Sequence, residues 1–179
     1  MRPLDQPGRS TVFTTNGMAA TSQPLSSITA IEILQAGGNA MDAAIAAVAV
    51  QCVVEPQSTG IGGDCFALLA PGGGPEVIGL NGSGWAPRGL TAEHLLEQGI
   101  NSIGVQSPHA VSVPGAIDSW DTLLRDHGTI DLDQALQPAI DYAENGWAVT
   151  PRIAVDWGRN VAKLAADASS AAKYLNDGR

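Results

Sequence analysis

The chain has 179 residues, of which 44% are hydrophobic and 15% are charged, a composition typical of one globular domain long enough to bury a core. Its formal net charge of -9 argues against nucleic acid and against an anionic membrane surface as partners. The two cysteines, Cys52 and Cys65, are too few for a disulfide framework, so we expect both to be buried thiols.

Residues 1–15 are predicted to form a surface arm. Residues 1–10 are polar, contain proline and arginine, and do not resemble a secretory signal, so we expect a cytoplasmic protein. Residues 18–21 should form a short strand. A helix should follow, with Thr21 or Ser22 as its cap and Pro24 in its first turn, because apolar residues recur downstream at near-helical spacing.

A second helix is predicted over residues 40–54, with Asn39 as its cap. This alanine-rich run is too short to span a bilayer and contains Asp42 and Gln51, so it is typical of a buried core helix. Asp42 lies in the first turn, where the helix dipole favours an acidic side chain. We interpret it as a structural carboxylate, because no second acid or histidine lies nearby in the sequence to support catalysis.

An antiparallel hairpin is predicted over residues 65–81, because two β-like runs flank a turn rich in glycine and proline. The first run, residues 65–70, is apolar on both faces, so we expect its sheet to be covered on both sides. The polar segment 81–87 leaves this rigid sheet, a place where binding sites are often built. The preceding glycines, at positions 60, 62 and 63, either allow tight packing or line a substrate pocket.

Further helices are predicted over residues 91–98, 114–127, 132–145 and 154–174, with a loop and a short strand before the second of them. No metal or cofactor is expected. The three histidines are isolated in the sequence and lack the ligand spacing of a metal site; they are His94, His109 and His127.

Several blocks of the sequence resemble, in order and with the expected spacing, the amino-terminal half of the γ-glutamyltransferase family. The blocks are Gly17-Met18 to Pro24, Glu32 to Asp42, Glu55-Pro56, Gly60-Ile61-Gly62-Gly63, Ala86-Pro87, Val113-Pro114-Gly115 and Pro138 to Gly146. A single Gly-Ile-Gly-Gly would be weak evidence, but blocks in register along residues 16–179 are specific. We therefore predict that residues 16–179 are the amino-terminal part of an incomplete domain of this type.

The resemblance implies an α+β fold, the αββα four-layer sandwich of the N-terminal-nucleophile hydrolases, of which this chain would be a part. Members of the family are made as precursors that cleave themselves. The new terminal threonine of the carboxy-terminal subunit is the nucleophile, and its own α-amine can act as the base. We therefore expect no catalytic residue in this chain and the carboxy-terminal catalytic subunit as its partner.

The implied function is cleavage of an amide bond by acyl transfer from a γ-glutamyl or related small acyl amide to water or an amine. Two alternatives stay open. One is an amidohydrolase or acylase with a non-glutamyl substrate. The other is a non-catalytic fragment that only binds a partner subunit.

Three residues are candidates for substrate binding by the same resemblance: Asn81, Ser83 and Trp85. Authentic transferases carry an arginine before Ala-Pro that binds the α-carboxylate of the γ-glutamyl group, and counting back from Ala86-Pro87 places Ser83 there. A serine cannot form the paired charge-assisted bonds of an arginine, so the segment looks more like the acylase and amidohydrolase relatives. Trp85 either shapes an acyl pocket or covers the sheet, and Arg88 is expected at the surface.

Overall fold

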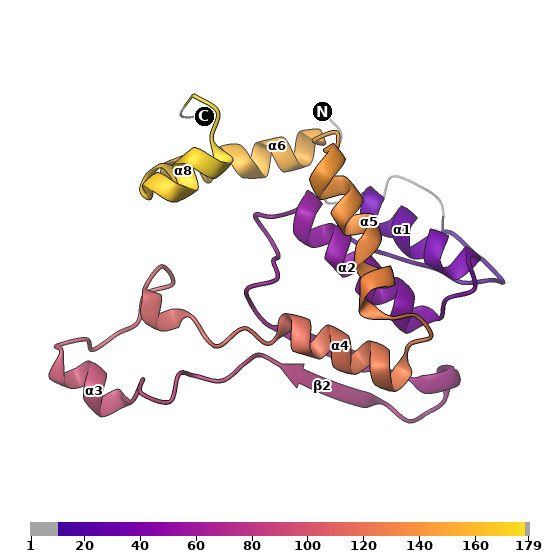
Figure 1. Cartoon of the computed structure of the whole chain (residues 1–179), viewed down its shortest axis with the longest axis horizontal. Helices are drawn as coiled ribbons and strands as arrows, with labels where there is room; N and C mark the ends of the chain where they lie inside the picture. The colour runs from indigo at the N-terminus through magenta and orange to yellow at the C-terminus, as the bar shows by residue number, and fades with distance from the viewer. Residues whose placement is uncertain (1–10, 178–179) are drawn as a thin grey trace.

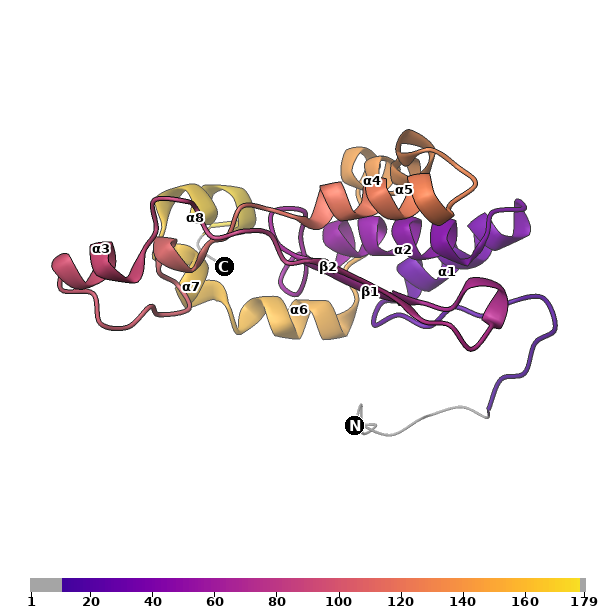
Figure 2. The same ribbon diagram turned by 90° about the horizontal axis from the view of Figure 1, so that it is seen from below.

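The computed structural model describes residues 11–177, so most of the predicted arm, residues 1–15, lies outside the described part. Within residues 11–177 the chain is mostly helical and has one two-stranded sheet. Figures 1 and 2 show a helical body lying on one face of the sheet, and a long excursion that leaves the body and returns to it. The α+β class is confirmed in this coarse form, but the four layers implied by the resemblance are not formed within the described residues.

Two packed helices open the body. They are α1, Pro24–Gln35, and α2, Ala40–Val54. The cap of α1 is Gln23, whose side chain accepts from the Leu25 N–H, while the Thr21 hydroxyl donates to the Gln23 carbonyl at 2.6 Å. The expectation that Thr21 or Ser22 is the cap is therefore wrong, and residues 18–21 form no strand.

The start of α2 is fixed by the predicted cap. The Asn39 side chain accepts from the Met41 and Asp42 N–H groups, and the Asp42 carboxylate accepts from the Asn39 N–H at 2.7 Å. Asp42 is fully buried and also accepts from Thr129 and Ile130, in the turn between α4, Ala116–His127, and α5, Leu132–Asn145. Burial raises the pKa of this carboxyl, but the hydrogen bonds from Thr129, Asn39 and Ile130 outweigh burial and hold the pKa below its usual value. Asp42 is thus a structural carboxylate that joins two parts of the body.

The hairpin is confirmed. Strand β1, Cys65–Leu69, pairs antiparallel with β2, Ile78–Gly82, so that Cys65 lies opposite Gly82. One face of the sheet packs on the core beneath α4, Ala116–His127, and α5, Leu132–Asn145. The core includes the following buried side chains: Ile45, Val50, Val54, Trp120, Leu123 and Leu124.

The other face of the sheet is bare. Phe66 is 65% exposed and Leu68 is 81% exposed, so the expectation that both faces are covered is not met within the described residues. Phe66 and Leu68 are exposed because alternate side chains of the apolar strand β1 point away from the helices. The two-stranded sheet has no second layer on that side to cover them.

The excursion between β2 and α4 carries a short helix, α3, Ala92–Glu97, capped by Thr91, where a helix over residues 91–98 was predicted. It also carries a single 3-10 turn, Pro108–Ala110, where a loop and a strand were expected. Figure 1 shows the excursion extending away from the helical body. Its residues therefore add little to the buried core.

The carboxy-terminal region is broken into three helices, where one helix over residues 154–174 was predicted. They are α6, Pro151–Gly158, α7, Val161–Ala165, and α8, Ala168–Tyr174. Local caps mark two of these starts: the Thr150 side chain accepts from the Ile153 N–H, and the Asp167 carboxylate accepts from the Ser170 N–H at 2.7 Å.

In the described part of the chain, no helix has the length and apolar character needed to cross a membrane.

Candidate functional site

Two chain segments that are distant in sequence meet at the start of α4. The Gly63 carbonyl oxygen accepts from the N–H of Gly115 at 3.0 Å and from the N–H of Ala116 at 3.1 Å. The first turn of α4 is thereby attached to the glycine-rich loop that precedes β1. This attachment holds the start of α4 in place beside the end of β2, where the candidate segment begins.

The segment that carries the three candidate residues is held by the returning end of the excursion. The Trp85 carbonyl oxygen accepts from the Val113 N–H at 2.9 Å, and the Ser83 carbonyl oxygen accepts from the Ser112 hydroxyl at 3.0 Å. We call this paired region, residues 83–85 with residues 112–113, the neck of the excursion. It gives the candidate segment a defined backbone although it lies outside the sheet.

Close backbone approach in this region requires glycine. Gly84 has a φ of +78°, and a Cβ built on it would lie 1.8 Å from the Val113 carbonyl oxygen. A Cβ on Gly115 would lie 2.3 Å from the Gly82 carbonyl oxygen. No side chain fits at either position without moving backbone, so these glycines set the geometry of the neck.

Ser83 and Asn81 are joined to one another. The Asn81 side-chain oxygen accepts from the Ser83 N–H at 3.1 Å, and the Ser83 hydroxyl donates to the Gly84 carbonyl oxygen at 3.4 Å. Ser83 is half-buried, whereas Asn81 is exposed. The Asn81 amide nitrogen and a weakly engaged hydroxyl are therefore the polar groups that this segment can present to a ligand.

Trp85 is 86% exposed, so within the described chain it neither covers the sheet nor closes a pocket around Ser83. Arg88 is exposed as predicted. The structure thus places Asn81, Ser83 and Trp85 on one short, fixed segment, with only the first two in contact. Their role in substrate binding stays a prediction.

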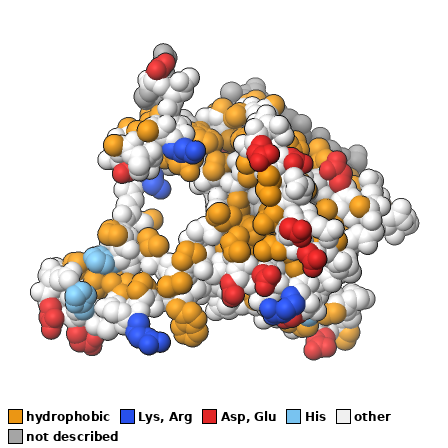
Figure 3. Space-filling view, in the orientation of Figure 1, with side chains coloured by type: hydrophobic (Ala, Val, Ile, Leu, Met, Phe, Trp, Pro, Cys, Tyr) orange, Lys and Arg blue, Asp and Glu red, His pale blue; other side chains and the backbone are white. Residues whose placement is uncertain are grey.

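The glycine-rich loop borders a groove rather than a tight contact. A Cβ on Gly60, Gly62 or Gly63 would meet no atom within 4 Å, which argues against a packing requirement. Gly60 and Gly62 line a groove of about 520 Å³ between the ends of α2 and α5 and the start of α4. Figure 3 shows hydrophobic side chains gathered on this side of the helical body, beside an opening between the body and the excursion.

A buried carboxylate at the end of α2 was not anticipated from the sequence. Glu55 is 7% exposed, and its Oε2 accepts from the Ser22 hydroxyl and from the Gln51 amide, the latter at 2.8 Å. Its carbonyl oxygen accepts from the Ser58 and Thr59 N–H groups, so the same residue shapes the turn that leads into the glycine-rich loop. The spacing of Gln51 and Glu55 by one helical turn is the signal that could have indicated the network.

The described residues contain no group of three metal-binding side chains, and His94, His109 and His127 lie on separate elements. Cys52 and Cys65 are free, as predicted, but only half-buried. Burial raises the pKa of both thiols, which keeps them protonated and unreactive near neutral pH. These side chains therefore offer no evident nucleophile.

A family model described as gamma-glutamyltranspeptidase matches residues 26–179. The chain belongs to the gamma-glutamyltranspeptidase family. It is 36% identical over 169 residues to the glutathione hydrolase-like YwrD proenzyme of Bacillus subtilis. The match covers 94% of this chain and 32% of that protein. The chain therefore spans about a third of that relative and corresponds to the amino-terminal portion of larger proenzymes.

Solved structures of the gamma-glutamyltranspeptidase family extend the comparison to the fold. A crystal structure of Helicobacter pylori gamma-glutamyltranspeptidase aligns with a TM-score of 0.85 at 31% identity, covering 94% of this chain and 49% of that one. The crystal structure of cephalosporin acylase from Bacillus halodurans aligns with a TM-score of 0.79 at 43% identity, covering 90% of this chain and 30% of that one. The helical body with its small sheet thus matches part of the fold of the family.

Proposed function

We propose that this chain is the amino-terminal part of an amide-cleaving N-terminal-nucleophile hydrolase that prefers a small acyl group without a free α-carboxylate. The observation that carries the proposal is Ser83, fixed by the neck at the position where the family resemblance places a carboxylate-binding arginine. The nucleophilic threonine and the oxyanion donors are supplied by the part of the protein outside this chain. Cleavage proceeds through an acyl-enzyme, which is resolved by water or by an amine.

The polar groups near Ser83 suit a neutral acyl group. The segment offers a hydroxyl from Ser83 and the amide nitrogen of Asn81, since the Asn81 oxygen is already engaged. Arg88 lies past Pro87, exposed, in a separate turn that is closed by a hydrogen bond between Pro87 and Leu90. A γ-glutamyl α-carboxylate placed at Ser83 would lose a bidentate partner, at a cost on the order of 2–4 kcal/mol.

Curated relatives of the two kinds are about equally similar to the chain, at 36% identity for a glutathione hydrolase-like proenzyme and 37% for an acylase proenzyme, whereas the two solved structures differ. Identity is 43% to the Bacillus halodurans cephalosporin acylase and 31% to the Helicobacter pylori gamma-glutamyltranspeptidase, over similar shares of this chain. Acylases and glutathione hydrolases are both among the relatives, so the acyl group is the property that a test must address.

The bare face of the sheet supports a partner within the same precursor. We propose that the remaining part of the protein packs on Phe66 and Leu68 and completes the αββα sandwich. Both side chains are more exposed than is usual for large apolar residues in a sheet face that packs against a second layer. The unpaired outer edges of β1 and β2 are then available to further strands.

The experiment compares two chromogenic anilides in the full-length enzyme. One carries a γ-glutamyl group, and the other carries a 4-aminobutyryl group, which is the same acyl chain without its α-carboxylate. Wild type should prefer the 4-aminobutyryl anilide. The Ser83→Arg variant should raise kcat/KM for the γ-glutamyl anilide by roughly 10- to 150-fold, the worth of a contact of ~1.4–3 kcal/mol. Trp85 is 86% exposed in the described chain, so its ring does not close over Ser83 there.

The matched control is Ser102→Arg, which adds the same charge at an exposed serine in the excursion and should leave both substrates unchanged. If wild type already prefers the γ-glutamyl anilide, or if both arginine variants behave alike, Ser83 does not select the acyl group. If turnover of either anilide changes with the residue at position 83, the chain takes part in substrate selection by the enzyme. A chain that only binds a partner subunit would show no such change.

A further inference from the structure

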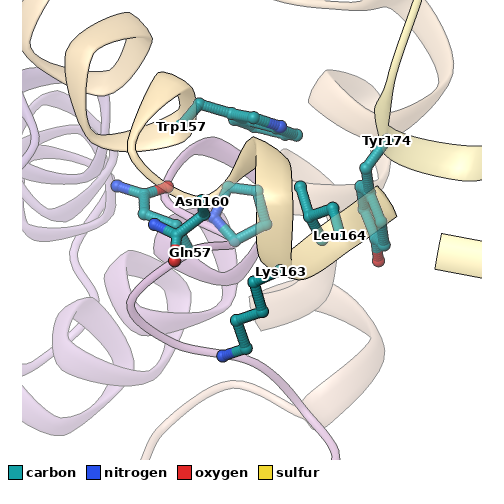
Figure 4. A pocket seen from close by; sticks show the side chains of 7 residues that line it. Gln57, Trp157, Asn160, Lys163, Leu164 and Tyr174 are labelled. Carbon is teal, nitrogen blue, oxygen red and sulfur yellow. The ribbon is translucent and has the colours of Figure 1, made fainter. Parts of the chain in front are cut away.

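A small pocket lies between the loop after α2 and the three carboxy-terminal helices (Figure 4). Its volume is about 180 Å³, room for roughly six water molecules or one substituted six-membered ring. The residues that line it come from sequence positions far apart; they are Pro56, Gln57, Trp157, Asn160, Lys163, Leu164 and Tyr174. None of these residues belongs to the neck or to the segment that carries Ser83.

The apolar walls of the pocket are suited to a flat ring. The rings of Trp157 and Tyr174 lie 6.0 Å apart between centroids and are inclined by 56°. Leu164 adds an aliphatic wall, and Figure 4 shows its side chain beside the Tyr174 ring. Two inclined aromatic faces and an aliphatic chain favour an aromatic guest through edge and offset contacts.

The polar groups of the pocket indicate which charge and which hydrogen-bonding group a ligand should carry. The side-chain oxygen of Gln57 is buried, and it has no hydrogen-bond partner among the described residues. A buried acceptor without a donor is costly, and a ligand N–H or O–H would satisfy it. Lys163 lines the same pocket and forms no ion pair within residues 11–177.

The sign of the ligand charge follows from this lining. No carboxylate lines the pocket, although the chain has 18 acidic against 9 basic residues. The acidic side chain of α6, Asp156, is already engaged by Arg152 and Arg159. A cationic ligand would meet only Lys163, whereas an anionic ligand would gain a charge-assisted partner.

We propose that this pocket binds a small aromatic carboxylate that carries an N–H or O–H donor. The ring lies against Trp157 and Tyr174, the carboxylate meets the Lys163 ammonium group, and the donor satisfies the Gln57 oxygen. The pocket shares no residue with the neck, although Tyr174 also lines the groove beside the glycine-rich loop.

The test is equilibrium dialysis of the chain against 4-hydroxybenzoate and 3-hydroxybenzoate, a method that reports bound ligand whatever the association state of the protein. The two isomers vary the distance between the carboxylate and the hydroxyl. At least one isomer should bind about tenfold more tightly than benzoate, which lacks the donor, and than 4-hydroxybenzyl alcohol, which lacks the charge. Failure of both isomers to bind more tightly than these two analogues would overturn the proposal.

Three variants locate the site. Lys163→Gln should weaken binding of the preferred isomer about tenfold, and Gln57→Leu should remove the preference over benzoate. The matched control, Lys173→Gln, removes the same charge from an exposed lysine of α8 that does not line the pocket and should bind as wild type does. Helix content by circular dichroism establishes that each variant is folded. Equal binding by folded Lys163→Gln and Lys173→Gln would show that the ligand lies elsewhere and overturn the proposal.

Discussion

Replacing Asp42 by asparagine removes the charge that joins α2 to the turn between α4 and α5. One carboxylate oxygen accepts from the backbone N–H of Thr129 at 2.8 Å and of Ile130 at 3.3 Å. The other accepts from the Asn39 N–H at 2.7 Å and from the Thr129 hydroxyl. An asparagine has the same shape but one acceptor oxygen, so its NH₂ group must face the Asn39 N–H if its oxygen faces Thr129 and Ile130.

The expected loss follows from that geometry. The variant forfeits charge assistance in the bonds it keeps and leaves one buried backbone donor without an acceptor. The sum is on the order of 2–4 kcal/mol in the free energy of unfolding, a large share of the roughly 5–15 kcal/mol typical of a domain.

Urea denaturation of dilute protein at neutral pH, followed by tryptophan fluorescence, measures this loss. The matched control is Asp133→Asn, because Asp133 also lies in the first turn of a helix but is exposed. The control should change the free energy of unfolding by no more than about 0.5 kcal/mol. Equal effects of the two substitutions would refute the structural role of Asp42.

The pH dependence supplies a second criterion. Hydrogen bonding holds the pKa of folded Asp42 below the ordinary value of 3.8, so the unfolded chain binds this proton more readily as the pH falls. The stability contributed by Asp42 is therefore fully present above the unfolded pKa and is lost as the pH falls through the folded pKa. The stability advantage of wild type over Asp42→Asn should be constant from neutral pH to about pH 5 and should shrink below about pH 4. An advantage that grows on acidification contradicts this sign.

Three further predictions concern activity, association and backbone geometry. On the proposed function, which places the nucleophilic threonine outside this chain, the chain alone should show no amidase activity toward a γ-glutamyl anilide; multiple turnover by the purified chain would contradict this. The chain should self-associate through Phe66 and Leu68, and sedimentation should show that replacing both by lysine lowers the association. Gly84→Ala should destabilise the chain by at least about 2 kcal/mol more than Gly72→Ala, since both glycines have positive φ but only Gly84 faces a carbonyl oxygen at contact distance; matching urea midpoints would exclude that clash.

The helices and the hairpin could be predicted where local chemistry decides the structure. Asn39, Thr91 and Asp131 lie directly before helices that begin as expected. The glycine-rich and proline-rich turn after β1 brings the two strands together in antiparallel register. These signals act over a few residues, so a sequence pattern contains them.

Other features depend on partners distant in the sequence. The helix predicted over residues 154–174 is interrupted at residues 159–160 and 166–167, and Asp167 caps the last helix in a way that an apolar pattern does not register. The buried position of Glu55 requires Ser22, which lies on the far side of α1 in the sequence.

The candidate site likewise combines one feature that the local sequence indicates and one that depends on contacts between distant residues. Counting from Ala86-Pro87 was enough to single out Ser83, but no local pattern indicates that Gly84 and Gly115 approach other backbone atoms closely. That contact is made only after the excursion returns, so it is a property of the tertiary structure.

The neck has a consequence for how the protein can change. Because the entering and returning segments of the excursion are hydrogen-bonded at Trp85 and Val113, the closure is complete before α3 begins. Residues added or removed beyond that closure alter the size of a surface loop at small entropic cost and leave the backbone at Ser83 where it is. The excursion can therefore vary in length and sequence, or accept an inserted domain, while the segment beside the sheet keeps its shape.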